Sequence, residues 1–132
     1  MSIFVDASAL VAILADEADR DGHEARLAAS TESFWSAMTE WETVSALVSS
    51  YGQSFADARD KVRSAASVIG LTMVPIDEGV SDTALAVYQR YGRGSGHRAK
   101  LNMGDCFAYA CAKVSGSELL YKGNDFTHTD LA

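Results

Sequence analysis

The sequence contains few of the residues that build disulfide frameworks or membrane spans. Its 132 residues include two cysteines and one proline. Cys106 and Cys111 form no Cys-x-x-Cys pair, so neither a disulfide framework nor a zinc knuckle is expected. No apolar run reaches the roughly 18 residues that a membrane helix needs, and the first residues lack the basic start of a signal peptide. We therefore expect a reduced, cytoplasmic protein with no membrane segment.

Basic residues are also scarce, and their placement is uneven. The chain has 11 Lys and Arg against 18 Asp and Glu, a formal net charge of −7, which argues against a general nucleic-acid binder. Residues 90–100, called the basic segment below, nevertheless contain no acidic residue and four cations: Arg90, Arg93, Arg98 and Lys100. One basic segment on an acidic body indicates a local anion-binding site.

Hydrophobic residues are plentiful enough, at 48%, to build a core, and the length predicts a single domain over residues 1–132. Short apolar runs alternate with longer segments of helical periodicity. Strands are expected at 3–5, 33–37, 71–76 and 119–121, and helices at 8–15, 21–29, 39–51, 54–69, 78–91 and 104–114. Ser8, Thr39 and Asn102 are the expected helix caps, with Glu42 completing a capping box. The alternation predicts a three-layer α/β/α domain with a short, mostly parallel sheet of about four or five strands.

Four carboxylates stand beside strand ends. Asp6 follows the first strand, Glu42 lies in the first turns of the helix after the second, Asp105 begins the last helix, and Asp125 follows the fourth strand. Ligands of such folds bind beyond the carboxyl ends of the strands. Carboxylates brought together there repel one another, and a bound cation would offset the repulsion. Mg²⁺ is the hard divalent ion expected at such a site. The sequence therefore predicts an acidic metal site.

Each carboxylate also has a structural interpretation. Asp6 is a possible helix cap, Glu42 a capping-box acceptor, Asp105 a favourable partner of a helix dipole, and Asp125 a turn residue. Glu40 competes with Glu42 for the inward position. Glu42 is preferred because the packed side of its helix is expected to contain Trp41, Val44, Ser45 and Val48.

Three segments carry a resemblance to a known family: IFVDASALVAIL, SAMTEWETVSAL and the stretch from RYGRGSGHRAK through LNMGDCFAYACAK to KGNDFTHTDL. With them the whole chain resembles PIN-domain ribonucleases, and more closely the VapC toxins of prokaryotic toxin–antitoxin pairs. The resemblance implies an endoribonuclease that hydrolyses RNA phosphodiester bonds with Mg²⁺, for which Mn²⁺ can substitute. It also implies a homodimer that a VapB-type antitoxin neutralises.

The resemblance also assigns roles to residues. Asp6 and Asp105 match the principal metal ligands, Glu42 matches the glutamate of the SAxTxxE segment, and Asp125 matches the acid before Phe126. Asn124 is the alternative to Asp125, as an amide that reaches metal-bound water. Ala7 stands where relatives usually have Thr or Asn, which leaves Ser8 as the residue available to hydrogen-bond Asp6.

Two alternatives stay open at this stage. The basic segment is expected either to clamp the RNA backbone or to be a solvated linker, with His97 interpreted as an exposed loop residue rather than a phosphate donor. The chain as a whole is expected to be a nuclease, and the alternative is a non-catalytic PIN-like module that acts through a protein partner.

Overall fold

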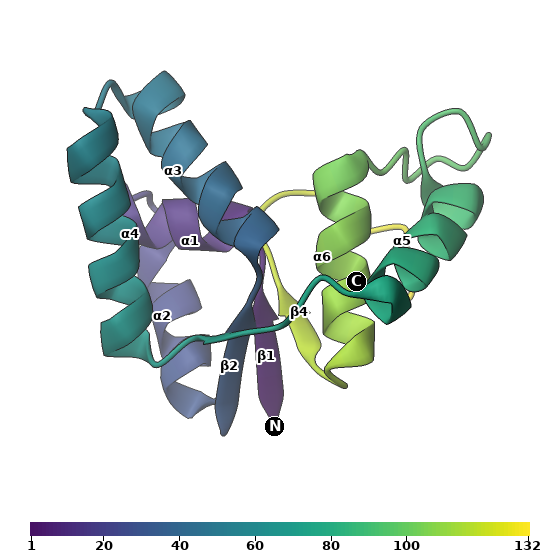
Figure 1. Ribbon diagram of the computed structural model, residues 1–132, viewed down its shortest axis with the longest axis horizontal. Coiled ribbons are helices and arrows are strands. Elements are labelled where there is room, and N and C mark those ends of the chain that lie inside the picture. The colour runs from purple at the N-terminus through teal and green to yellow at the C-terminus, as the bar shows by residue number, and fades with distance from the viewer.

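Helices cover both faces of a four-stranded sheet in the computed structural model, which describes residues 1–132 (Figure 1). None of the helices combines the length and the apolarity that crossing a bilayer requires. In chain order the elements are β1 (Ser2–Val5), α1 (Ala7–Leu14), α2 (Arg20–Ala29), β2 (Glu32–Trp35), α3 (Ala37–Tyr51), α4 (Phe55–Ile69), β3 (Thr72–Met73), α5 (Glu78–Tyr91), α6 (Met103–Val114) and β4 (Glu118–Leu120).

The sheet is parallel throughout, in the order β3-β2-β1-β4. Phe4 of β1 is paired with Phe34 of β2 on one side and with Leu119 of β4 on the other. The three-layer α/β/α prediction is confirmed, with four strands. Because all strands run the same way, their carboxyl ends lie along one edge, where α1 and α3 begin.

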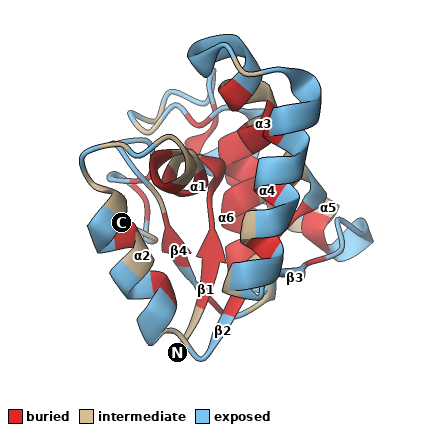
Figure 2. Ribbon diagram, turned by 90° about the vertical axis from the view of Figure 1, so that its left-hand side faces the viewer, coloured by how far each residue is buried: buried red, intermediate tan, exposed pale blue.

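Alternate side chains of the strands enter two separate cores. Phe4 and Leu119 pack with residues of α5 and α6, whereas Val5 and Leu120 pack with residues of α1, α3 and α4. This is the two-residue period of a strand buried on both faces. Figure 2 shows β1 and most of β4 buried and the outer surfaces of the helices exposed, whereas both residues of β3 are exposed. The central strand β1 is therefore held from both sides, and so is the residue that follows it.

Two helix starts differ from the sequence prediction. α1 is capped by Asp6, whose carboxylate accepts a hydrogen bond from the Ser8 amide, so Ser8 is not the cap. α3 is capped by Ser36, whose hydroxyl accepts from the Thr39 amide at 3.3 Å while Thr39 accepts in return from the Ser36 amide. The predicted box of Thr39 and Glu42 is therefore wrong. β2 ends at Trp35, and α3 begins at Ala37, directly after its cap.

The strand predicted at 71–76 is reduced to the two residues of β3. The amide of Val74 still donates to the carbonyl of Trp35 at 2.7 Å. Pro75 then has no N–H to continue the ladder, and the chain leaves the sheet.

Candidate active site

The end of β1 places a carboxylate in the interior. Asp6 is 8% exposed, and its Oδ2 accepts hydrogen bonds from the Ser8 amide at 3.1 Å and the Ser8 hydroxyl at 2.5 Å. Burial raises the pKa of Asp6, and the bonds from Ser8 offset part of that rise. The Ser8 hydroxyl also accepts from the backbone amide of Lys122, just after β4. Asp6 is thus the helix cap, as one of its sequence interpretations predicts, and it is also a buried acid.

The first turn of α6 presents the second buried acid. Asn102 caps the helix by accepting from the Asp105 amide at 2.8 Å, and the Asp105 carboxylate accepts from the Asn102 amide at 3.1 Å. Asp105 is 9% exposed. Burial, followed by the negative charges of Asp125 and Asp6, raises the pKa of Asp105 to about 7. Asp6 and Asp105 therefore lie within electrostatic reach of each other.

Glu42 on α3 joins this pair. Burial, and then the charges of Asp6 and Asp105, raise the pKa of Glu42 to about 7. Its carboxylate lies directly over Gly104, where an added Cβ would overlap the carboxylate oxygens. Gly104 thus makes room for an acid from another helix. Sequence reasoning missed this residue, and the one available signal was a glycine in the first turn of a helix, beside Asp105.

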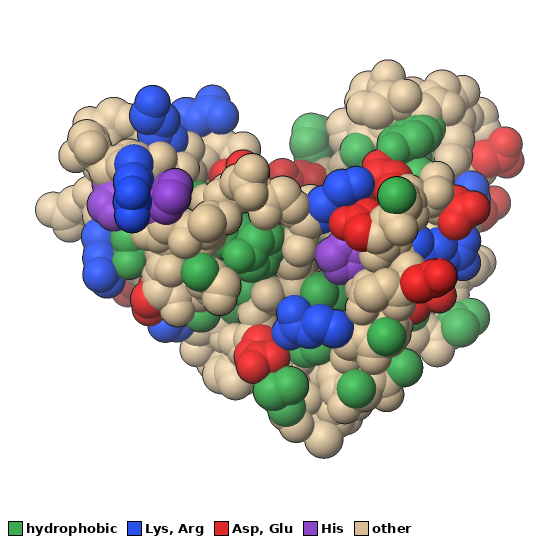
Figure 3. All heavy atoms as spheres, turned by 180° about the vertical axis from the view of Figure 1, so that it is seen from behind, with side chains coloured by type: hydrophobic (Ala, Val, Ile, Leu, Met, Phe, Trp, Pro, Cys, Tyr) green, Lys and Arg blue, Asp and Glu red, His purple; other side chains and the backbone are tan.

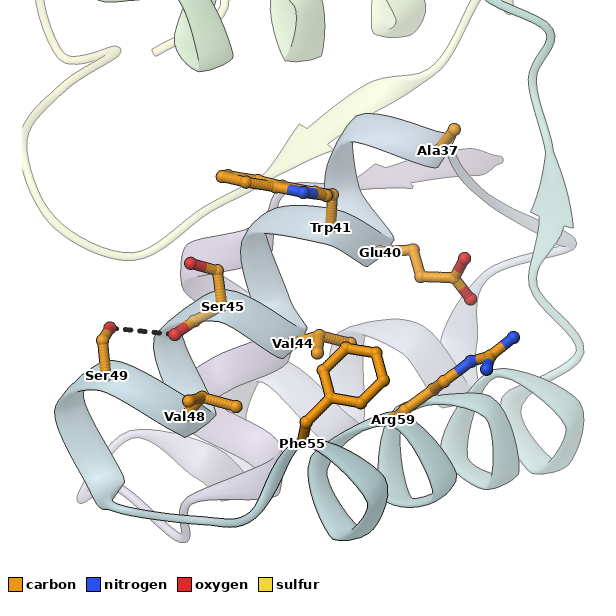
Figure 4. Close-up of a pocket in the computed structure, with 9 residues that line it drawn as sticks. All are labelled: Ala37, Glu40, Trp41, Val44, Ser45, Val48, Ser49, Phe55 and Arg59. Carbon is orange, nitrogen blue, oxygen red and sulfur yellow. Dashed lines mark hydrogen bonds between the residues drawn. The ribbon is translucent and has the colours of Figure 1, made fainter.

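Glu40 takes the other direction. It lines an open pocket of about 460 Å³ between α3 and α4 (Figure 4). Its carboxylate lies 3.6 Å from the guanidinium of Arg63, which the figure does not draw. Trp41 lines the same pocket and is 68% exposed. The expectation that Trp41 and Val48 form a packed side around Glu42 is therefore wrong, because that side of α3 is the open pocket. Glu42 points instead toward α6.

The turn after β4 supplies the fourth acid. Asp125 is exposed, and its charge contributes to the raised pKa of both Asp6 and Asp105. Asn124, the amide alternative, is also exposed, and its backbone carbonyl accepts from the Thr127 amide while its side chain has no hydrogen-bond partner. Of the two neighbours, Asp125 is the one that acts electrostatically on the buried acids.

The donor set suits a hard divalent cation. It consists of carboxylate oxygens, and burial together with mutual repulsion disfavours their charged forms, which a bound cation would reverse. No three acidic, His or Cys side chains converge closely enough to enclose one ion. Mg²⁺ needs no such cage, since it commonly keeps several waters and takes one or two protein carboxylates. Asp6 and Asp105 are the pair that fits this role.

The basic segment lies on one side of the acids. Seen from behind, the molecule is hollowed between two lobes. Acidic side chains lie at the notch, and Lys, Arg and His side chains gather on the lobe that carries α5 (Figure 3). None of the four cations of the segment forms an ion pair with a carboxylate. Arg93, Arg98 and Lys100 are exposed, and Arg90 lies over the ring of Tyr91 at 4.6 Å. The segment therefore offers unneutralised positive charge.

Comparisons with known proteins place the chain in a family. A model of the PIN domain matches residues 3–131. Ribonuclease VapC30 of Mycobacterium tuberculosis is 41% identical over 97% of this chain and 95% of its own length. Ribonuclease VapC of Mycolicibacterium smegmatis is 43% identical over 97% of this chain and 96% of its own length.

Solved structures agree in fold. The crystal structure of the Mycobacterium tuberculosis toxin VapC20, described as cleaving the sarcin–ricin loop, has a TM-score of 0.74 at 17% identity and covers 95% of this chain and 92% of its own. A toxin–antitoxin complex from Klebsiella pneumoniae has a TM-score of 0.71 at 20% identity, covering 99% and 94%. The chain belongs to the PIN-domain family. Within that family it is a member of the VapC ribonucleases, as the sequence predicts.

The raised pKa values make folding stability depend on pH. Well below pH 3.8 the Asp105 carboxyl is neutral in both the folded and the unfolded chain, whereas near pH 4 it is about half ionised in the unfolded chain alone. As the pH rises toward the folded-state pKa of about 7, ionisation increasingly favours the unfolded chain, where the ordinary value is 3.8. In EDTA we expect the free energies of unfolding of Asp105→Asn and the wild type to differ least near pH 4, and the variant to exceed the wild type at pH 8 by about 1 kcal/mol or more.

Urea unfolding of both proteins at pH 4, 6 and 8 tests this difference. Asp60→Asn, at an exposed position of α4, is the matched control and is expected to follow the wild type at every pH. If the two free energies of unfolding differ by the same amount at every pH, or if Asp105→Asn is the less stable protein at pH 8, the raised pKa of Asp105 is contradicted.

Proposed function

We propose that this chain is an endoribonuclease toxin that hydrolyses RNA phosphodiester bonds with Mg²⁺ and is neutralised by a VapB-type antitoxin. The observation that carries the proposal is the electrostatic coupling of Asp6, Glu42, Asp105 and Asp125 at one edge of the sheet. Membership of the VapC ribonucleases supports the same activity.

Asp6 and Asp105 are the residues that would hold the ion. A divalent cation supplies a water nucleophile at neutral pH and neutralises charge on the scissile phosphate. Mn²⁺ has the same preference for carboxylate and water ligands, so it is expected to substitute. Ser8 keeps Asp6 in place through two hydrogen bonds, and the Asn102 cap does the same for Asp105.

Glu42 is the group best placed to handle the proton of an attacking water. A carboxylate beside the proposed metal ligands is a group that can accept a proton from water, and its partial burial favours the protonated form that this produces. Gly104 lets its carboxylate approach the first turn of α6. Asp125, which is exposed on the turn after β4, adds a further negative charge beside Asp105.

The unpaired cations of the basic segment support an RNA substrate. Phosphate contacts position a strand without reading its sequence, and they come from Lys and Arg whose charge is free. Arg90, Arg93, Arg98 and Lys100 meet that condition on a chain that is otherwise acidic. The structurally similar toxin VapC20 is described as cleaving an RNA loop, which supports the same substrate class.

The antitoxin proposal is supported by the likeness to a toxin–antitoxin complex. Homodimer formation and a cytoplasmic location, which the family resemblance and the composition imply, stay predictions.

Removing either principal carboxylate tests the active site. Asp6→Asn and Asp105→Asn keep the side-chain size and one acceptor oxygen for the cap, so the fold is expected to persist. Cleavage is expected to fall by about 100-fold or more, because each variant loses a negative ligand of the metal. The measurement is cleavage of total cellular RNA by the purified proteins in Mg²⁺, with Asp60→Asn as a fully active control. Wild-type rates in both variants would refute the assignment.

The effect of metal ions on thermal stability tests metal binding separately from activity. Mg²⁺ or Mn²⁺ binding only to the folded chain is expected to stabilise it by about 2.7 kcal/mol at a concentration 100 times the dissociation constant. The thermal unfolding midpoint should therefore rise with either ion. It should stay unchanged in an Asp6→Asn, Asp105→Asn double variant. A wild-type midpoint that is insensitive to both ions counts against a metal-dependent nuclease and favours the non-catalytic interaction module.

Gly104 provides a test in which stability and activity move apart. Gly104→Ala adds a Cβ where the Glu42 carboxylate lies, so this flexible side chain must move. Alanine is favoured over glycine in helices by up to about 1 kcal/mol, so the variant is expected to be at least as stable as the wild type. Cleavage is expected to fall about 10- to 100-fold, because displacement by about an ångström has such effects.

Gly22→Ala is the matched control. Gly22 lies in α2, and an added Cβ there meets nothing within 4 Å. This variant should gain similar stability and keep full activity. Full activity in Gly104→Ala as well would remove Glu42 from the mechanism.

A further inference from the structure

The basic segment leaves the body of the protein between two hydrogen-bonded neighbours. The Leu101 amide donates to the Tyr91 carbonyl at 2.9 Å, and the Arg93 amide donates to the Leu101 carbonyl at 3.0 Å. Tyr91 and Leu101 are 3% and 1% exposed. Residues 93–100 therefore form a closed loop with a fixed base, seen in Figure 1 between α5 and α6.

His97 holds the tip of this loop against the body. Its Nδ1 accepts a hydrogen bond from the Ala99 amide at 3.0 Å, and its own amide donates to the Ser95 hydroxyl at 3.2 Å. The imidazole meets the ring of Tyr91 edge-on, at 4.8 Å between centroids and 85° between planes. Tyr91 packs in turn against Tyr109 of α6 at 5.9 Å. His97 is thus half-buried and joins the loop to the helix that carries Asp105.

The positions of the two cations that follow His97 depend on the backbone of this loop. Arg98 comes directly after His97, and Lys100 comes directly after Ala99. Lys100 has a φ of +50°, in the left-handed region that residues with a Cβ rarely adopt. Such a conformation persists only where neighbouring contacts impose it. The bond from the Ala99 amide to His97 and the bond from Arg93 Nε to the Lys100 carbonyl, at 3.4 Å, are the contacts on either side.

We infer that His97 is a positioning residue for RNA, which fixes the loop so that Arg98 and Lys100 act together on the phosphate backbone. The inference rests on the proposed function, since it concerns how the same enzyme holds its substrate. The Nδ1 atom is already occupied by the Ala99 amide, so the role that the contacts support is structural organisation of the cations. Direct donation from Nε2 to a phosphate is the competing explanation, and it makes different predictions.

Salt dependence separates the two roles. The slope of log affinity against log salt counts the phosphates that are neutralised, about one unit for each lost cation. If His97 positions both cations, His97→Ala lowers the slope by about two, as does Arg98→Ala with Lys100→Ala. Adding His97→Ala to that pair then changes little further. If His97 only donates to a phosphate, the slope stays nearly constant and the effects of the substitutions add.

The assay is fluorescence anisotropy with a fluorescein-labelled RNA stem–loop in 50 to 300 mM KCl. All proteins carry Glu42→Gln and Mg²⁺ is present, so that Asp6 and Asp105 can hold the ion while the probe stays intact. His97→Asn places an amide oxygen at the position of Nδ1 and is expected to restore most of the slope. His97→Gln places its amide near Nε2 instead and is expected not to restore it. Hydrogen exchange of the Ala99 amide is expected to rise in His97→Ala and to return toward the wild-type rate in His97→Asn.

Two results would overturn the inference in distinguishable ways. If the reference protein binds the probe and His97→Ala keeps its salt slope, or if only His97→Gln restores binding, His97 does not position the cations although RNA remains the ligand. If the reference protein fails to bind the probe at any salt concentration, the inference and the proposed RNA substrate fail together.

Discussion

The burial of Asp6 at the end of the central strand is the constraint on which the active site depends. Strands on both sides and cores on both faces fix β1, so the carboxylate that follows it cannot move out to solvent without disrupting α1, which it caps. Hydrogen bonds from the amide and hydroxyl of Ser8 and from the Ala7 amide compensate part of the cost of its charge. Its negative charge adds to their own burial in disfavouring the ionised forms of Asp105 and Glu42. The sheet that stabilises the fold thus also imposes the electrostatic cost of the site.

Contacts of Lys122 with Ser8 and Glu17 hold the turn that carries Asp125. The Lys122 amide donates to the Ser8 hydroxyl at 2.9 Å, and its ammonium group lies 2.5 Å from a carboxylate oxygen of Glu17. Tyr51 at the end of α3 also donates to Glu17. The beginning of α1, the end of α3 and the segment after β4 are therefore joined by a polar network beside the site. This arrangement keeps the exposed Asp125 close to two buried acids, whose pKa values its negative charge raises.

Periodicity predicted most of the helices and strands, and the rule about strand ends predicted where Asp6 and Asp105 lie. Local patterns were less decisive, because Ser36 with Thr39 and Thr39 with Glu42 both fit a capping box. The choice has consequences. With Thr39 as the cap, Glu42 would be engaged at the helix start, whereas capping by Ser36 leaves it free to reach Gly104. That contact joins α3 to α6, and no pattern within one segment encodes it. The exposure of Trp41 was missed for the same reason, since it depends on how α3 packs against α4.

The acids at the notch and the cations on the lobe that carries α5 have a thermodynamic consequence for the proposed function. A phosphate drawn toward Arg98 and Lys100 must also approach four carboxylates, which repel it at short range. A divalent cation held by Asp6 and Asp105 reverses the sign of that part of the surface, so each ligand makes the binding of the other more favourable. Such coupling is reciprocal by necessity. Under the proposed function, metal and RNA would therefore be cooperative ligands of one site, and tight binding of RNA would be disfavoured where the ion is scarce. An acidic body with one organised basic loop is, on this argument, a means of making substrate binding conditional on the metal.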